Sequence, residues 1–251
     1  MLKKLLKIAT WIGIAAWFVV VLGFVSSESN RVLCNRLDVI LSDTVLHRFV
    51  TPTDVRQMLE ESDFQLQGYP IDEIDIRKLE STLEKNAYIK NAEVSTDISG
   101  RLEVNVEQRV PLVRILPEGK GGYYLDTEME VLPLSEQYTP LLLLASGNIP
   151  FPDQNGEAKD QLGELFSFCT YLLEHPLWKE QIVQIYVNKS GEYELIPRVG
   201  AHHILLGELE MWELKLRNLE LLYKQGLSRQ GWNRYGTINL KYTNQVICTK
   251  R

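Results

Sequence analysis

The spacing of hydrophobic residues changes once between residues 75 and 106, from a helical period to a strand period. Ile76, Leu79 and Leu83 fall on one side of a helix, and Asp75 stands where an N-cap residue is expected. The pattern therefore predicts a short amphipathic helix that begins after Asp75.

The strand period follows directly and predicts a β-hairpin with one buried face. Ser99-Gly100 supplies the tight turn, since glycine tolerates the positive φ that hairpin turns need, and residues 97–101 are expected to form the tip of the hairpin. The alternating positions are Ala92, Val94, Thr96 and Ile98 before the turn, and Leu102, Val104 and Val106 after it.

A strand and a helix are expected before this helix and hairpin. Residues 37–41 form an apolar run typical of a strand, and Thr51-Pro52 opens a helix whose inner face includes Val55 and Leu59. Proline suits the first helical position, where the backbone N–H has no intrahelical partner. The order strand, helix, helix, strand, strand over about residues 36–109 predicts a small α+β domain with both helices on one face of the sheet.

Beyond Pro111 the pattern predicts a second, larger domain built on a mixed sheet. The turn-rich segment 117–122 marks its boundary or its first hairpin. Its expected strands cover residues 123–125, 131–134, 141–145, 182–187, 193–197, 203–206 and 237–242, the last of which could continue to Cys248.

Two amphipathic helices are expected in this second domain, at about residues 160–174 and 210–224, with Gly226 as the C-terminal cap of the later helix. Their inward-facing residues are Leu162, Leu165, Phe166, Cys169, Leu172 and Leu173 in the first helix, and Leu209, Trp212, Leu216, Leu219 and Tyr223 in the second.

Residues 8–25 form an uncharged run that predicts a transmembrane helix. At ~1.5 Å per residue such a helix spans roughly 27 Å, close to the hydrocarbon core of a bilayer. Lys3, Lys4 and Lys7 precede the run, so the positive-inside rule predicts a cytoplasmic N-terminus and a chain that lies mostly outside the membrane. A cleaved secretory signal ending near residues 25–27 is the alternative.

Charge and motifs argue against several function classes. The net charge of −6 at pH 7 gives no electrostatic basis for binding nucleic acid. The sequence has no nucleophile elbow, zinc-protease, P-loop or dinucleotide-binding motif. His202 and His203 are adjacent, so on a strand they point to opposite faces and cannot share a metal. We therefore expect no catalytic residues, no cofactor and no metal.

The three cysteines show no metal-binding spacing. Cys169 falls on the apolar side of a predicted helix and is expected to be a small buried residue. Cys34 and Cys248 could form a disulfide in an oxidising compartment.

A binding surface is expected at the end of the chain. The last predicted strand lies close to the final residue, Arg251, and we expect it to form an open sheet edge. Such an edge exposes unpaired N–H and C=O groups, to which a partner segment can add as the next strand. Asn239, Lys241 and Thr243 would present polar side chains to solvent. A closed edge without a partner is the alternative.

Tyr88-Ile89 and Asn91-Ala92 follow the predicted helix, and the hairpin ends in the segment VEQRVPLVRI, where Arg109 and Pro111 lead into an apolar run ending at Ile115. Together with the N-terminal run and the terminal strand, this order resembles the POTRA domain and overall layout of the bacterial division proteins of the FtsQ/DivIB family.

The resemblance implies an α+β chain in three parts: a cytoplasmic tip and transmembrane anchor at residues 1–30, a POTRA domain at 31–112 and an FtsQ-type β domain at 113–251. It implies a non-enzymatic, single-pass scaffold of the division machinery in the cytoplasmic (inner) membrane, with its bulk in the periplasm and enriched at the septum. Its partners would be FtsB/DivIC-like and FtsL-like single-pass proteins and, indirectly, the septal peptidoglycan synthase.

In that family the terminal strand carries an acidic residue, Leu, a basic residue and Tyr, and it binds FtsB by strand addition. The matching segment is 239–242, with Asn239 in place of the acid. An envelope assembly factor with a POTRA domain and an anchored periplasmic enzyme of cell-wall metabolism remain alternatives. The expected partner-binding residues are Ile238, Asn239, Leu240, Lys241, Tyr242, Thr243, Asn244 and Gln245.

Overall fold

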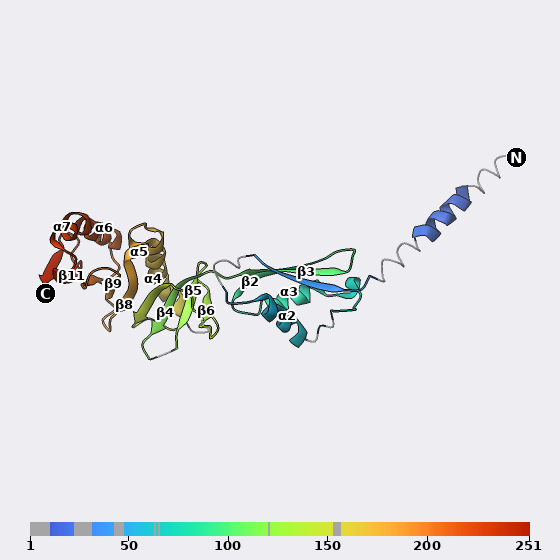
Figure 1. The fold of residues 1–251 in the computed structure, drawn as a ribbon, viewed down its shortest axis with the longest axis horizontal. Coiled ribbons are helices and arrows are strands. Elements are labelled where there is room, and N and C mark those ends of the chain that lie inside the picture. Colours follow the sequence, from blue (N-terminus) through green and yellow to red (C-terminus); the bar gives the residue numbers. More distant parts are fainter. Residues whose placement is uncertain are drawn as a thin grey trace. The chain divides into compact units, whose positions relative to one another are not determined.

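A computed structural model describes residues 11–22, 32–42, 48–62, 64, 66–119, 121–152 and 157–251, and it divides the chain into two units (Figure 1). Unit 1 is Met1–Gln108 and unit 2 is Arg109–Arg251. Residues 11–22 are helical, whereas both ends of the predicted transmembrane run, residues 8–10 and 23–25, lie outside the described residues. Within the described ranges, no helix has the length and apolar character needed to cross a membrane.

Unit 1 has the predicted order of elements. They are β1 (Arg36–Leu41), α2 (Pro52–Glu61), the 3-10 turn η1 (Ile71–Glu73), α3 (Ile76–Leu83), β2 (Ile89–Thr96) and β3 (Arg101–Gln108). The sheet order is β1-β3-β2, in which β3 pairs parallel with β1 and antiparallel with β2. Figure 1 shows α2 and α3 on the same side of these strands.

The starts of both helices follow from local sequence, as predicted. Thr51 caps α2 by accepting the Asp54 N–H, while the Asp54 side chain accepts the Thr51 N–H, which completes a capping box ahead of Pro52. Asp75 caps α3 by accepting the Lys78 N–H at 3.1 Å.

The hairpin buries one face and turns at the predicted tip, residues 97–101, but the strand alternation does not extend to Ile98 as expected. Ile98 lies in the turn, not in a strand, and is 98% exposed. Strand β2 ends at Thr96 because the Asp97 side chain accepts the backbone N–H groups of Ser99 and Arg101 and so fixes the turn. The buried hairpin positions are Ala92, Val94, Leu102, Val104 and Val106.

Unit 2 contains one nine-stranded mixed sheet with helices, which confirms the α+β class. Its strands are β4 (Pro111–Pro117), β5 (Tyr123–Asp126), β6 (Val131–Pro133), β7 (Leu143–Gly147), β8 (Ile182–Val187), β9 (Tyr193–Pro197), β10 (His203–Gly207), β11 (Tyr235–Asn239) and β12 (Ile247–Lys250). Its helices are α4 (Glu157–Glu174), α5 (Trp178–Gln181), α6 (Trp212–Leu222) and α7 (Ser228–Gln230), with the π-helical turn η2 (Tyr223–Leu227) joining the last two.

The strand order is β12-β11-β10-β9-β8-β7-β4-β5-β6. The pairs β4/β7, β7/β8 and β10/β11 are parallel, and the other pairs are antiparallel. Because β10 and β11 are parallel, the chain must cross over between them, and α6, η2 and α7 form that crossover.

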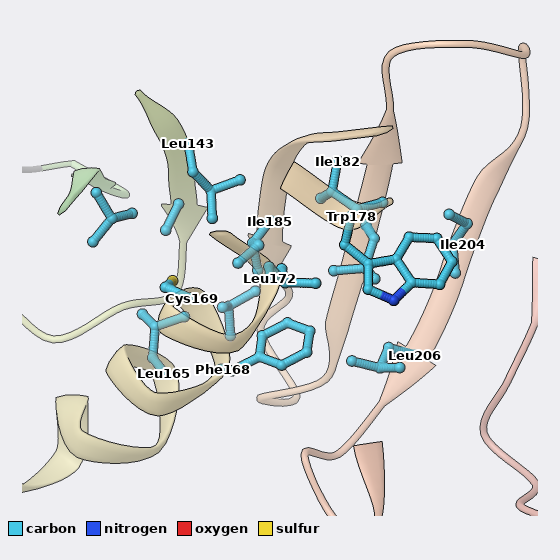
Figure 2. Packing of buried hydrophobic residues seen from close by; sticks show 14 of the residues in the cluster. Leu143, Leu165, Phe168, Cys169, Leu172, Trp178, Ile182, Ile185, Ile204 and Leu206 are labelled. Carbon is cyan, nitrogen blue, oxygen red and sulfur yellow. The ribbon is translucent and has the colours of Figure 1, made fainter. Parts of the chain in front are cut away.

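Helix α4 packs its apolar side against the sheet, as predicted (Figure 2). Leu165, Cys169 and Leu172 are buried against residues of β7, β8 and β10. Phe168 is fully buried as well, whereas the predicted inward residue Phe166 is only partly buried. The buried side of α4 is therefore rotated slightly around the helix axis, toward Phe168 and away from Phe166.

The predicted end of the later helix is wrong. Gly226 does not cap it, because the chain continues through η2 into α7, and the glycine in a positive-φ conformation is Gly231 (φ 96°). The inward face is confirmed for Leu216, Leu219 and Tyr223, all of which are buried.

Candidate partner-binding edge

The edge strand at the C-terminal end of the unit 2 sheet is β12. Strand β11 pairs with β10 on one side and with β12 on the other, so it is an internal strand. The prediction that residues 237–242 form the open edge is therefore wrong. The predicted continuation to Cys248 is also wrong, because residues 240–246 turn the chain back and β12 pairs antiparallel with β11.

Two predicted partner-binding residues lie on the face of the sheet that is turned to the core. Ile238 is fully buried and Leu240 is 1% exposed, because both point into the core of unit 2. Asn239 is half-buried, and its side chain accepts the Lys241 backbone N–H at 2.9 Å. These side chains hold the end of β11 in place.

The other predicted residues lie in the turn between β11 and β12. Lys241 Nζ donates to Glu192 Oε1 at 2.6 Å, and the Thr243 carbonyl accepts from Asn218 Nδ2 at 3.0 Å, which ties the turn to α6. Tyr242 is 53% exposed. Asn244 and Gln245 are exposed too.

Strand β12 is the element that the sequence interpretation missed. Of its residues, Ile247, Thr249 and Lys250 are exposed and Cys248 is half-buried. The strand has only four residues, so its sequence pattern is short. Val246, just before the strand, and Cys248 alternate with the exposed residues Ile247 and Thr249. Cys248 packs against the core, which fixes the face that Ile247 and Thr249 present to solvent.

The last residue fastens this edge to the body of unit 2. Arg251 Nη2 donates to the Ala201 carbonyl at 2.8 Å, and the Arg251 backbone N–H donates to the Arg234 carbonyl at 3.4 Å. Strand β12 therefore joins the sheet through its whole length, and only its outer side is left for pairing.

Two family models match the chain. One, described as a POTRA-like domain, matches residues 32–107. The other, described as FtsQ/DivIB, C-terminal related, matches residues 110–249, which is more than half of the chain and includes most of β12. The chain belongs to the FtsQ/DivIB family. A search of curated proteins found no significant match.

The two FtsQ/DivIB-type domains indicate a cell-division scaffold, of a family that is generally non-enzymatic. Within the described ranges, no three metal-ligating side chains lie close enough to hold an ion. His202 is buried and His203 is exposed, so the two rings point apart as predicted.

The cysteines of this FtsQ/DivIB chain are free thiols. Burial raises the pKa of Cys169 to about 12, and it also raises the pKa of Cys248. A thiol with a raised pKa stays protonated at neutral pH and is a poor nucleophile.

Proposed function

We propose that the chain is a non-enzymatic, single-pass scaffold of the bacterial division machinery. Residues 8–25 anchor it in the cytoplasmic membrane with the N-terminus inside, and the two units lie on the extracytoplasmic side at the division septum. It binds FtsB/DivIC-like and FtsL-like single-pass proteins there, and through them it recruits and regulates the septal peptidoglycan synthase.

The observation that supports this proposal is the open edge of β12 at one end of a nine-stranded sheet. A partner segment in extended conformation forms main-chain hydrogen bonds with such an edge and becomes the next strand. We place the partner site on β12 and the turn before it, whereas the sequence predicted it at residues 238–245. Residues 238–245 contribute by holding β12 and, through Tyr242, by direct contact.

Two exposed apolar side chains supply the contacts that main-chain pairing lacks. Ile247 is 41% exposed on β12, and Tyr242 is 53% exposed in the preceding turn. Tyrosine, with tryptophan and arginine, is enriched among the residues that contribute most to the binding energy of protein interfaces, and Ile247 adds apolar area that a partner would bury. Their positions next to the open edge support a contact that combines strand pairing with apolar anchoring.

The test is capture of the full chain by its FtsB-like partner. Removing the six residues after Gln245 deletes β12 and is expected to abolish capture, whereas Ile247→Glu and Tyr242→Glu keep the sheet and should weaken capture roughly ten-fold, as loss of ~1.4 kcal/mol would. The matched control is Leu141→Glu, because Leu141 is 97% exposed in the same unit and lies away from the edge strands.

Circular dichroism of each variant checks that the fold is retained. Full capture by both Ile247→Glu and Tyr242→Glu would remove this edge as the partner site. A photo-crosslinker placed first at Ile247 and then at Thr249 should link the partner. Crosslinks that form only from positions elsewhere in the chain would also remove the β12 edge as the partner site.

A further inference from the structure

Three large side chains that unit 1 leaves exposed lie at one end of its sheet. Ile98 is 98% exposed, Leu33 is 48% exposed and Tyr69 is 42% exposed. We refer to these three residues as the hydrophobic tip. They come from three separate segments of the chain, so their position at a common end is a property of the fold.

Hydrogen bonds bring the first two segments together. The Cys34 N–H donates to the Tyr69 carbonyl at 2.8 Å, and Leu33 forms a β-bridge with Pro70. The segment in which the chain enters unit 1 is therefore paired with the segment that carries Tyr69.

The β2–β3 turn lies against the same entry segment. Asn35 donates twice to it, from its backbone N–H to the Gly100 carbonyl and from Nδ2 to the Ser99 carbonyl, both at 2.8 Å. Contact is so close that a Cβ on Gly100 would lie 2.4 Å from the Leu33 carbonyl oxygen. Ile98 therefore projects from the end of unit 1 at which the chain enters.

The polar groups around Ile98 are already bonded within the turn. Asp97 accepts the Ser99 hydroxyl, the backbone N–H groups of Arg101 and Ser99, and the Arg101 Nε–H. These interactions, of which the bond from the Ser99 hydroxyl is the largest, hold the pKa of Asp97 below its usual value. The turn can thus approach an apolar phase without leaving these N–H groups unpaired.

Nearby charges are also paired with one another. Arg101 bonds Asp97 at 3.1 Å, and Arg36 bonds Asp38 at 2.8 Å. Because these two cations are each matched by a carboxylate, they add little electrostatic attraction for anionic surfaces. What this end of unit 1 presents is apolar side chains and one tyrosine, a residue type that is enriched at membrane interfaces.

Chain length restricts where this end can be. Only residues 26–31 separate the end of the apolar run at Val25 from Val32, where the description of unit 1 begins. Six intervening residues span at most roughly 25 Å even when fully extended. If Val25 lies at the membrane surface, the hydrophobic tip cannot be far from the lipid.

We propose that the hydrophobic tip rests in the interface of the bilayer, with Ile98 at the boundary between headgroups and acyl chains. This inference rests on the proposed anchoring through residues 8–25. The contact is apolar, so it does not require anionic lipid. It would give unit 1 a second attachment to the membrane and so limit how unit 1 can turn about its anchor.

The experiment uses the full chain reconstituted in vesicles, with one environment-sensitive fluorophore on I98C or on K85C. Lys85 is an exposed control in the same unit, beyond the opposite end of the eight-residue strand β2 and thus roughly 25 Å from the tip. C248S is included in both variants because Cys248 is half-buried, whereas Cys34 and Cys169 are buried.

In vesicles of phosphatidylcholine alone, the probe on I98C should emit at shorter wavelength than the probe on K85C. Aqueous iodide should quench the probe on I98C at most about half as strongly as the probe on K85C, because the interfacial position lies ~5–10 Å into the headgroup region. Vesicles of phosphatidylethanolamine and phosphatidylglycerol should give the same difference.

Equal quenching of both probes, in a chain that remains in the vesicles after an alkaline wash, overturns the tip contact and leaves the anchor intact. Loss of the chain from washed vesicles overturns the anchor and the tip together. Protection of I98C that appears only after an FtsB-like partner is added assigns the tip to a protein contact and likewise overturns the lipid contact.

Discussion

Each edge strand of unit 1 is bonded by a side chain from a neighbouring helix, whereas the edge strand β12 of unit 2 is not. Glu80 of α3 accepts the Val94 N–H of β2 at 2.9 Å, and Arg56 of α2 makes a longer contact of 3.5 Å with the Leu37 carbonyl of β1. In the part of the chain that the structure describes, no side chain bonds the backbone of β12.

The comparison shows that the sheet edges of one chain differ in how far side chains already bond their backbone. A backbone N–H that already donates to a carboxylate is not free for a partner strand, so Glu80 protects β2 in the way that inward-turned charges protect other edges. The remaining edge of unit 2, β6, is only three residues long and ends in Pro133, which has no N–H to donate.

The largest expected effect is the unfolding of unit 1 by a substitution that leaves the β12 edge of unit 2 in place. Val104→Asp puts an unpaired carboxylate at a fully buried position of β3 and should destabilise unit 1 by roughly 3–5 kcal/mol, enough to unfold it. Urea unfolding followed by circular dichroism measures this loss, with Glu103→Asp on the same strand as the control. Partner capture through β12 should persist, and its disappearance would show that unit 1 takes part in binding.

A smaller effect is expected when the protected edge is opened. Glu80→Ala removes the carboxylate that accepts the Val94 N–H and should cost about 1.5–3 kcal/mol, since the bond involves a charged group. Hydrogen exchange at the Val94 amide should become faster, which mass spectrometry or NMR detects. Glu84→Ala, one turn further along, is the control, and equal exchange in both variants would contradict the protective role of Glu80.

Acid should weaken unit 2 through a buried histidine. His202 is 2% exposed, Nε2 lies 2.9 Å from the Tyr223 hydroxyl, and burial lowers the pKa of the ring below its ordinary value of 6.5. The folded state prefers the neutral ring, so this contribution to stability is fully present above pH 6.5 and is lost as pH falls through the lowered folded pKa.

Urea unfolding midpoints measured above and below pH 6.5 test whether acid weakens unit 2 through His202. His202→Gln removes the titrating group and should flatten the pH dependence of the unit 2 transition. An unchanged pH profile in the variant would mean that another group is responsible.

The smallest expected effect concerns Lys241, which the sequence placed in the partner site. Its ammonium group bonds Glu192, and both side chains are about one-third exposed. Exposed ion pairs contribute little to stability, so Lys241→Ala should leave the unfolding midpoint nearly unchanged. Partner capture should also stay close to that of the unaltered chain, and a strong loss would place Lys241 in the interface.

Local chemistry made most of unit 1 predictable. Asp75 and Thr51 cap their helices by bonding residues three positions further along the chain. The alternating residues on either side of Gly100 belong to two strands that pair directly with each other, so no distant segment is needed to predict them. Ile98 was misplaced because alternation says where a strand could continue, while the side-chain bonds of Asp97 decide where it stops.

Long-range pairing made the partner edge harder to predict. Whether β11 is internal depends on a four-residue strand that gains its stability only by pairing with it. Lys215 is a second example. A lysine is normally exposed, but this one is only 4% exposed, because its Nζ donates to the carbonyls of Leu206 and Glu208. Such partners come from other elements and are invisible to a pattern along one segment.

The crossover between β10 and β11 has a consequence for the order of assembly. Parallel pairing of β10 with β11 has to close the long crossover between them, and non-local pairing of this kind is slow compared with hairpin closure. The hairpin of β11 and β12 is therefore expected to join β10 later than the neighbouring strands that are linked by short hairpins pair with each other. If β12 is the docking strand, as proposed, it is one of the last parts of the C-terminal unit to become ordered. An FtsB-like protein would then bind folded chains in preference to newly made ones.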